Sequence, residues 1–120
     1  MKRHPLVAAG ISACLLLAYL LPASAADIFC NGTVSAVYVS SDGSVVFSGS
    51  YRNDYTQACN VHGIWQGITS ETCFTWYSAL LAAKVHGKQV VVQYSTPSYT
   101  CATLPTYAFA LMPNYAMVAN

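Results

Sequence analysis

The sequence contains very little charge. Only 8% of its 120 residues are charged, with five Lys or Arg against four Asp or Glu. Nucleic acids and anionic membrane surfaces are bound through clusters of basic side chains, and residues 26–120 contain no such cluster. We therefore expect neither a nucleic-acid partner nor insertion into a membrane.

Residue patterns that carry catalysis or metal binding are also missing. The chain has no Gly-x-Ser-x-Gly elbow, no Cys-x-x-Cys, no His-x-x-x-His and no acidic calcium loop. Beyond the first residues, the histidines are His62, a polar position on an expected strand, and His86, favoured by the dipole at a helix end. The carboxylates stand at a terminus, a turn, a link and a helix start, where they are solvated: Asp27, Asp42, Asp54 and Glu71. We expect no catalytic residue, metal or cofactor, and therefore no enzyme.

The first 25 residues have the layout of a secretory signal peptide. A basic start at residues 2–4 precedes an apolar run that ends in Ala-Ser-Ala at residues 23–25. Because the run leads into this small-residue site rather than a charged stop, it favours a cleaved signal over a retained membrane anchor. Cleavage would leave residues 26–120 as one small exported domain, secreted or periplasmic.

A lipoprotein cleavage box is a competing interpretation, since residues 11–14, Ile-Ser-Ala-Cys, have that form. Three leucines follow at residues 15–17 and prolong the apolar run where a lipidated protein would become polar. The signal peptide therefore explains these residues better.

Cysteine usage predicts the covalent framework of the domain. Cys14 belongs to the expected signal peptide, and the domain keeps Cys30, Cys59, Cys73 and Cys101. An even number of cysteines in a small exported domain predicts two disulfides, with three alternative pairings. The order of the expected elements favours Cys30 with Cys59 and Cys73 with Cys101, because the second bridge would join a helix to a later loop.

Valine, tyrosine, threonine and serine dominate the segments expected to form strands. Residues 30–51 are interrupted by Ser-Asp-Gly at 41–43, which predicts a hairpin. After a polar link at 52–57, residues 58–65 form a third apolar segment. Residues 88–95 predict a fourth strand, and residues 106–120 supply one or two more.

One helix is expected between the third and fourth strands. It begins with Thr69 or Ser70 as N-cap, carries Glu71 in its first turn and ends at Gly87. Its apolar stripe has helical spacing: Cys73, Trp76, Tyr77, Leu80, Leu81 and Ala83 or Lys84. Strands on both sides of a single helix predict a mostly antiparallel α+β domain or a small barrel covered by a helix.

Aromatic rings and hydroxyl groups are in excess, with nine tyrosines and two tryptophans. A flat ring with a polar edge can contact a neutral ligand such as a sugar without using charge. The competing interpretation is that Tyr and Thr are frequent in small β domains for packing reasons alone.

Residues 59–94 resemble the pertussis-like toxin B subunits, which include the subtilase cytotoxin B subunit. The shared features are Trp65 before the helix, Gly87 after it and the run Gln-Val-Val-Val-Gln-Tyr at 89–94. They also resemble small exported bacterial proteins. The resemblance implies an OB-fold barrel with a helix between the third and fourth strands, assembled as a ring of five that binds cell-surface glycans. The family's disulfide between the second and third strands cannot form here, because residues 44–51 contain no cysteine.

Four residues are candidate ligand contacts. The resemblance places family sugar contacts on Tyr94, at the end of the strand after the helix, and on Asn31, before a glycine of the first strand. Tyr51, at a strand end, and Tyr99, in a loop, are further candidates. We expect a non-enzymatic exported module that binds a glycan; the alternative is a monomeric exported protein that binds or inhibits another protein.

Overall fold

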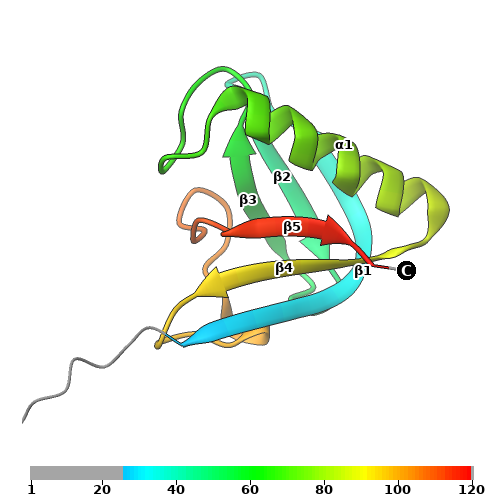
Figure 1. Cartoon of the computed structure of the whole chain (residues 1–120), viewed down its shortest axis with the longest axis vertical. Helices are drawn as coiled ribbons and strands as arrows, with labels where there is room; N and C mark the ends of the chain where they lie inside the picture. Colours follow the sequence, from blue (N-terminus) through cyan, green and yellow to red (C-terminus); the bar gives the residue numbers. More distant parts are fainter. Residues whose placement is uncertain (1–25, 120) are drawn as a thin grey trace, which may run out of the picture.

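The computed structural model describes residues 26–119, which form one five-stranded sheet and one long helix (Figure 1). All strand pairs are antiparallel, in the order β3-β2-β1-β4-β5. The expected OB-like β domain with a helix between its third and fourth strands is therefore confirmed. The expected signal peptide lies outside the described residues.

The elements are β1 (Asp27–Val39), β2 (Ser44–Gly49), β3 (Tyr55–Asn60), α1 (Ser70–His86), β4 (Gln89–Ser95), the short 3₁₀ helix η1 (Cys101–Thr103) and β5 (Tyr115–Val118).

Strand β1 holds the two halves of the sheet together, because it pairs with β4 over residues 27–33 and with β2 over residues 34–39. The register shifts between Val34 and Ala36, an irregularity of the kind that bends a strand. Figure 1 shows the resulting curvature of the sheet beneath α1. The outer strands β3 and β5 do not pair with each other; β3 instead meets the loop before β5 through a bridge between Thr56 and Tyr107.

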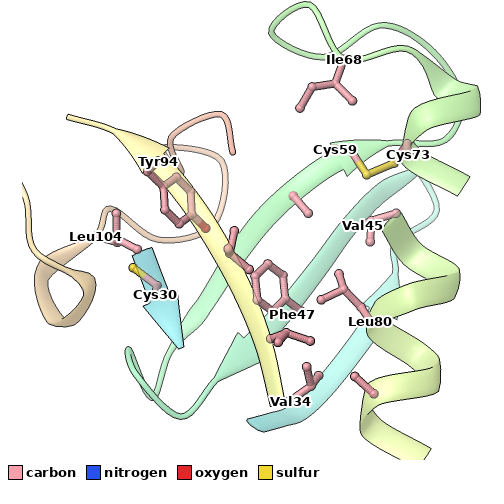
Figure 2. Packing of buried hydrophobic residues seen from close by; sticks show 14 residues of the cluster. Cys30, Val34, Val45, Phe47, Cys59, Ile68, Cys73, Leu80, Tyr94 and Leu104 are labelled. Carbon is pink, nitrogen blue, oxygen red and sulfur yellow. A yellow bond between two sulfur atoms is a disulfide. The ribbon is translucent and has the colours of Figure 1, made fainter. Parts of the chain in front are cut away.

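The core lies between the inner face of the sheet and α1 (Figure 2). Successive side chains of a strand point to opposite faces, so alternate residues of β1, β2 and β4 reach the core. Burying one large aliphatic or aromatic side chain contributes about 1.5–3 kcal/mol, which makes this layer the main source of stability. Its members include Cys30, Val34, Val45, Phe47, Val90, Val92 and Tyr94 from the strands, and Cys73, Leu80 and Ala83 from α1.

The turn between β1 and β2 forms as predicted. Asp42 accepts hydrogen bonds from the Ser40 hydroxyl (2.6 Å) and the Ser44 N–H (3.0 Å). These hydrogen bonds lower the pKa of Asp42, and the bond from Ser40 has the largest effect. The carboxylate therefore stays charged and continues to accept both bonds.

Helix α1 also begins and ends where expected. The Thr69 hydroxyl accepts a hydrogen bond from the Thr72 N–H (3.3 Å), as an N-cap does. Gly87 ends the helix in the left-handed conformation, with φ at +61°.

The buried stripe of α1 is narrower than predicted. Cys73, Leu80 and Ala83 are buried, but Leu81 and Lys84 are exposed. Neighbouring helical residues project about 100° apart, so the helix cannot bury Leu80 at the centre of the contact and Leu81 as well.

The third strand begins earlier than predicted. Tyr55–Asn60 pair with β2, although residues 55–57 were predicted to belong to a polar link. Residues 61–65, which were predicted to be part of the strand, lie beyond its end. The Asn60 side chain accepts a hydrogen bond from the His62 N–H (2.8 Å), which turns the chain out of the sheet.

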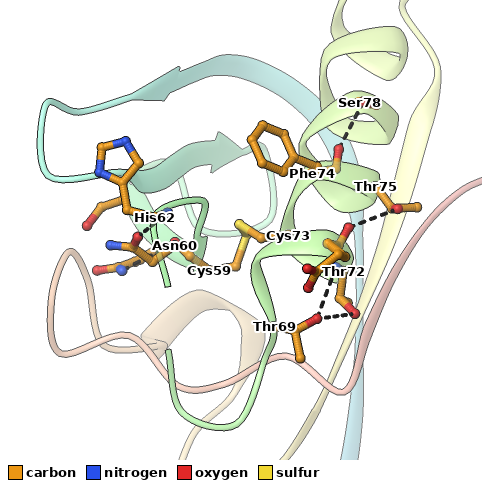
Figure 3. Close-up of a disulfide and its surroundings, with 12 residues drawn as sticks. Cys59, Asn60, His62, Thr69, Thr72, Cys73, Phe74, Thr75 and Ser78 are labelled. Atoms are coloured by element: carbon orange, nitrogen blue, oxygen red, sulfur yellow. Dashed lines mark hydrogen bonds between the residues drawn. A yellow bond between two sulfur atoms is a disulfide. The ribbon is translucent and has the colours of Figure 1, made fainter. Parts of the chain in front are cut away.

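All four cysteines of the domain are in disulfides, but the preferred pairing was wrong. Cys30 bonds to Cys101, and Cys59 bonds to Cys73 (Figure 3). The connection between β3 and α1, residues 61–69, turns back on itself through a bridge between Trp65 and Ile68, and Cys73 in the first turns of α1 lies beside Cys59 at the end of β3. The connection after β4 folds back under β1, so Cys101 reaches Cys30.

The C-cap glycine gives a direct test of this backbone. Gly87→Ala is expected to lower the free energy of unfolding by about 1 kcal/mol, because a side chain disfavours the left-handed conformation. Gly63→Ala is the matched control: no atom lies within 4 Å of its added Cβ and its φ is not positive, so we expect little change. Urea denaturation of both variants measures the difference; equal stabilities would contradict the assigned helix end.

Candidate functional site

Tyr94 is not available as a ligand contact. It is 1% exposed and points inward from β4 with Val90 and Val92 (Figure 2). The pairing of Tyr94 with Ile28 fixes this register, and a strand alternates its faces, so the phenol must enter the core. The prediction of Tyr94 as a sugar contact is therefore wrong for this structure.

Tyr51 is half-buried and packs against the backbone of two strands. A Cβ placed on Gly49 would lie 2.6 Å from Tyr51 Cε1, and one on Gly32 would lie 3.0 Å from its Cδ1. The ring thus lies over two glycines, and its hydroxyl is buried with that of Tyr94. Tyr51 therefore packs against the core with its hydroxyl buried, and its role as a ligand contact stays a prediction.

Asn31 and Tyr99 remain exposed, but the structure does not join them to the other two candidates. Asn31 lies on the outer face of the sheet, where it pairs with Val91 of β4. Tyr99 lies in the loop before η1. The four predicted residues therefore do not form one site.

Three other tyrosines lie close together and form what we call the tyrosine row: Tyr38, Tyr55 and Tyr107. The ring centroids of Tyr38 and Tyr55 are 5.8 Å apart, and those of Tyr55 and Tyr107 are 5.9 Å apart. The rings come from β1, β3 and the loop between β4 and β5. Tyr38 and Tyr107 are substantially exposed, so the row is a surface feature.

The strand pattern explains the position of the first two rings. Val45 and Phe47 of β2 face the core, so Val46 and Ser48 face outward. Tyr38 pairs with Val46, and Tyr55 pairs with Ser48. Because the two rings meet from either side of β2, Val46 and Ser48 are buried even on the outer face.

Tyr107 is held against β3 by its backbone. Its N–H donates a hydrogen bond to the Tyr55 carbonyl (2.8 Å), and its φ is +51°, a left-handed value uncommon for tyrosine. The Arg52 Nε donates to the Leu104 carbonyl (2.8 Å), which secures the same loop three residues earlier. Strained residues persist where surrounding contacts fix them, and they are frequent at binding sites.

The tyrosine row is uncharged apart from one neighbouring carboxylate. The pKa of Tyr107 is raised, first by desolvation and then by the charges of Asp54, Tyr38 and Tyr55. The phenol is therefore protonated at neutral pH and can donate a hydrogen bond. Flat rings with hydroxyl edges suit a neutral ligand rich in hydrogen-bonding groups.

A separate pocket of about 490 Å³ lies beside the start of α1. The side-chain nitrogen of Gln66 donates to the Ala110 carbonyl (3.1 Å), and that of Asn114 donates to the Ser95 hydroxyl (2.7 Å). Their side-chain oxygens therefore remain as acceptors. Charged residues do not line this pocket, which favours an uncharged occupant; the lining includes Gln66, Thr69, Thr72, Trp76, Met112 and Asn114.

Residues 26–119 present neither a cluster of metal ligands nor a membrane-spanning helix. Within this part of the chain, no three His, Cys, Asp or Glu side chains gather where they could hold a metal ion. None of its helical segments combines the length and apolar character of a membrane span.

Sequence reasoning missed the tyrosine row. Tyr38 could have been assigned to the outer face by counting along the hairpin, because residues of one strand alternate. Tyr107 carries no such signal, since its position depends on the path of a long loop.

Comparison with known proteins gave no match among protein-family models, curated proteins or solved structures.

The buried pair Tyr51 and Tyr94 makes a testable prediction, because the two hydroxyls are buried near each other and neither makes a hydrogen bond of good geometry. Burial raises the pKa of Tyr94 from 10.0 to about 12, and it also raises the pKa of Tyr51. The folded state therefore favours the protonated phenols. Stability should be independent of these groups below pH 10 and fall as the pH rises towards 12.

Tyr94→Phe removes an unpaired hydroxyl, so the free energy of unfolding at neutral pH should stay equal or rise slightly. Its loss of stability above pH 10 should be smaller than that of the wild-type protein. Chemical denaturation across this pH range measures both effects. A large destabilisation at neutral pH would show that the hydroxyl has a partner.

Proposed function

We propose that this protein is an exported, non-enzymatic binding module and that its ligand is a cell-surface glycan held by the tyrosine row. The observation that carries the proposal is the position of the row. Tyr38 and Tyr55 lie over β2 and β3, and Tyr107 belongs to the loop between β4 and β5. In OB folds, oligosaccharides and oligonucleotides bind at the face of the second and third strands and at this loop.

Charge favours the saccharide over the nucleic acid. The whole sequence has a formal net charge of only +1, and the carboxylate of Asp54 acts on Tyr107 of the row. A nucleic-acid site would need a basic groove. Sugar rings present apolar faces that can pack on tyrosine and hydroxyls that can bond to its edge.

The resemblance to pertussis-like toxin B subunits supports the same ligand class and an exported location. The two disulfides are compatible with an extracellular or periplasmic protein. Because Tyr94 is buried, the glycan contacts proposed here differ from those that the resemblance implies.

A second candidate function is recognition of another protein. Ile64 and Phe109 are largely exposed, and large exposed apolar side chains are common at protein interfaces. This candidate predicts binding that is unaffected by changes in the tyrosine row.

Binding to a glycan panel tests the proposal. Tyr38→Ala and Tyr107→Ala should each weaken glycan binding by about tenfold, which corresponds to about 1.4 kcal/mol. Tyr99→Ala is the matched control, since Tyr99 is 40% exposed and Tyr38 is 41% exposed, but Tyr99 lies outside the row. Isothermal titration with a glycan that scores in the panel gives the affinities, and unchanged melting temperatures show that the variants fold. A panel without binding, or equal effects of all three changes, would reject the proposal.

A further inference from the structure

Hydrogen bonds of the fold fix the walls of the pocket beside the start of α1. On one side, Trp65 and Ile68 exchange backbone hydrogen bonds of 3.0 and 2.9 Å in a tight turn. Elsewhere in the lining, the Asn114 N–H donates to the Gln93 carbonyl (2.8 Å), which ties the connection between β4 and β5 to the sheet. The Gln66 side chain joins the turn to the same connection. The pocket is therefore formed in advance of any ligand, as small-molecule sites usually are.

The polar side chains of the pocket offer both hydrogen-bond acceptors and a donor. The amide nitrogens of Gln66 and Asn114 already donate within the fold, which leaves their oxygens as acceptors. The Thr69 hydroxyl donates to the Thr72 hydroxyl (3.3 Å) and accepts the Thr72 N–H (3.3 Å), so the Thr72 hydroxyl keeps its own hydrogen (Figure 3). A hydroxyl both donates and accepts, so a ligand that carries several hydroxyls matches this set of groups.

Charged ligands are disfavoured at this pocket. Its lining contains no charged residue, so an ion that entered it would lose hydration without gaining a partner. The N-terminus of a helix can hold an anion, but Glu71 places a carboxylate in the first turn of α1. A hydrogen bond from its own backbone N–H lowers the pKa of Glu71, so this carboxylate is charged at neutral pH and repels a second anion.

The apolar part of the pocket suits a compact ring better than an extended peptide. Trp76 is half-buried and Met112 is 38% exposed, so an indole ring and a thioether are open to a ligand. A peptide that binds in the extended form needs free backbone groups along a sheet edge. The N–H groups of Ile68, Thr72 and Asn114 are already bonded within the fold. Side chains rather than backbone groups therefore recognise the occupant.

We propose that this pocket binds one uncharged sugar ring and is a saccharide site separate from the tyrosine row. Its volume of about 490 Å³ lies within the range of small-molecule sites, roughly 300–1,000 Å³. Thr72 and Asn114 are exposed, so the pocket opens to solvent and the rest of a glycan can remain outside. The ligand class is that of the proposed function, but no residue of the tyrosine row lines the pocket, so each site can be tested without the other.

Tryptophan fluorescence reports on this pocket directly. Trp65→Phe leaves Trp76 as the only tryptophan of the chain. The exported, oxidised protein is titrated with methyl galactoside, methyl glucoside and N-acetylglucosamine, and at least one of these neutral sugars should change the fluorescence in a saturable way. Sialic acid, whose ring carries a carboxylate, should leave the fluorescence unchanged.

Thr72→Val removes a hydroxyl from the pocket and keeps the shape of the side chain. It should raise the Kd of the sugar about fivefold, as expected for the loss of one hydrogen bond. Thr75→Val is the matched control on the same helix, because the Thr75 hydroxyl donates to the Glu71 carbonyl (3.2 Å) and does not line the pocket. Both changes are made in the Trp65→Phe protein and in the unmodified protein, where isothermal titration gives the Kd. Unchanged melting temperatures show that the variants fold.

Three results would overturn the proposal: no response to any of the neutral sugars, an equal response to sialic acid, or equal effects of Thr72→Val and Thr75→Val. Tyr38→Ala should leave the fluorescence titration unchanged, because Tyr38 lies outside the pocket. Sugar binding at the pocket without binding at the tyrosine row would reject the proposed function alone. Binding at the row that Thr72→Val does not alter, with a silent Trp76, would reject the pocket alone.

Discussion

The anchoring of the connection between β4 and β5 is the constraint on which the surface of this protein depends. Residues 96–114 contain only one short 3₁₀ turn, and a stretch of this kind is expensive to order. The Cys30–Cys101 disulfide fixes it to β1, and the Tyr107 N–H fixes it to β3. The connection thereby occupies the edge of β3 that β5 leaves open.

This anchoring places Tyr107 beside Tyr55 and completes the tyrosine row. It also places Met112 and Asn114 against the start of α1, where they help to line the pocket. The tyrosine row and the pocket are both nearly free of charge, in keeping with a sequence in which only 8% of the residues are charged. The surface of the domain therefore presents rings and hydroxyls more than ionic groups.

Local features were predictable from the sequence, and features that depend on distant pairing were not. Thr69 and Gly87 mark the helix ends through hydrogen bonds and backbone conformations within a few residues. The disulfide pairing depends on where the connection after β4 travels, which no local pattern encodes. Tyr94 was misassigned because the resemblance gives its place at a strand end but not the face to which the strand register turns it.

Removing one disulfide at a time separates the anchoring of the β4–β5 connection from the rest of the covalent framework. In Cys30→Ala/Cys101→Ala the connection loses its covalent anchor, whereas in Cys59→Ala/Cys73→Ala it keeps that anchor and only the β3–α1 link is lost. Glycan affinity is measured for both proteins, with circular dichroism to verify the sheet. The first variant is expected to retain the sheet but lose glycan binding, while the second variant should still bind. Equal glycan binding by the two folded variants would contradict the anchoring role of the Cys30–Cys101 disulfide.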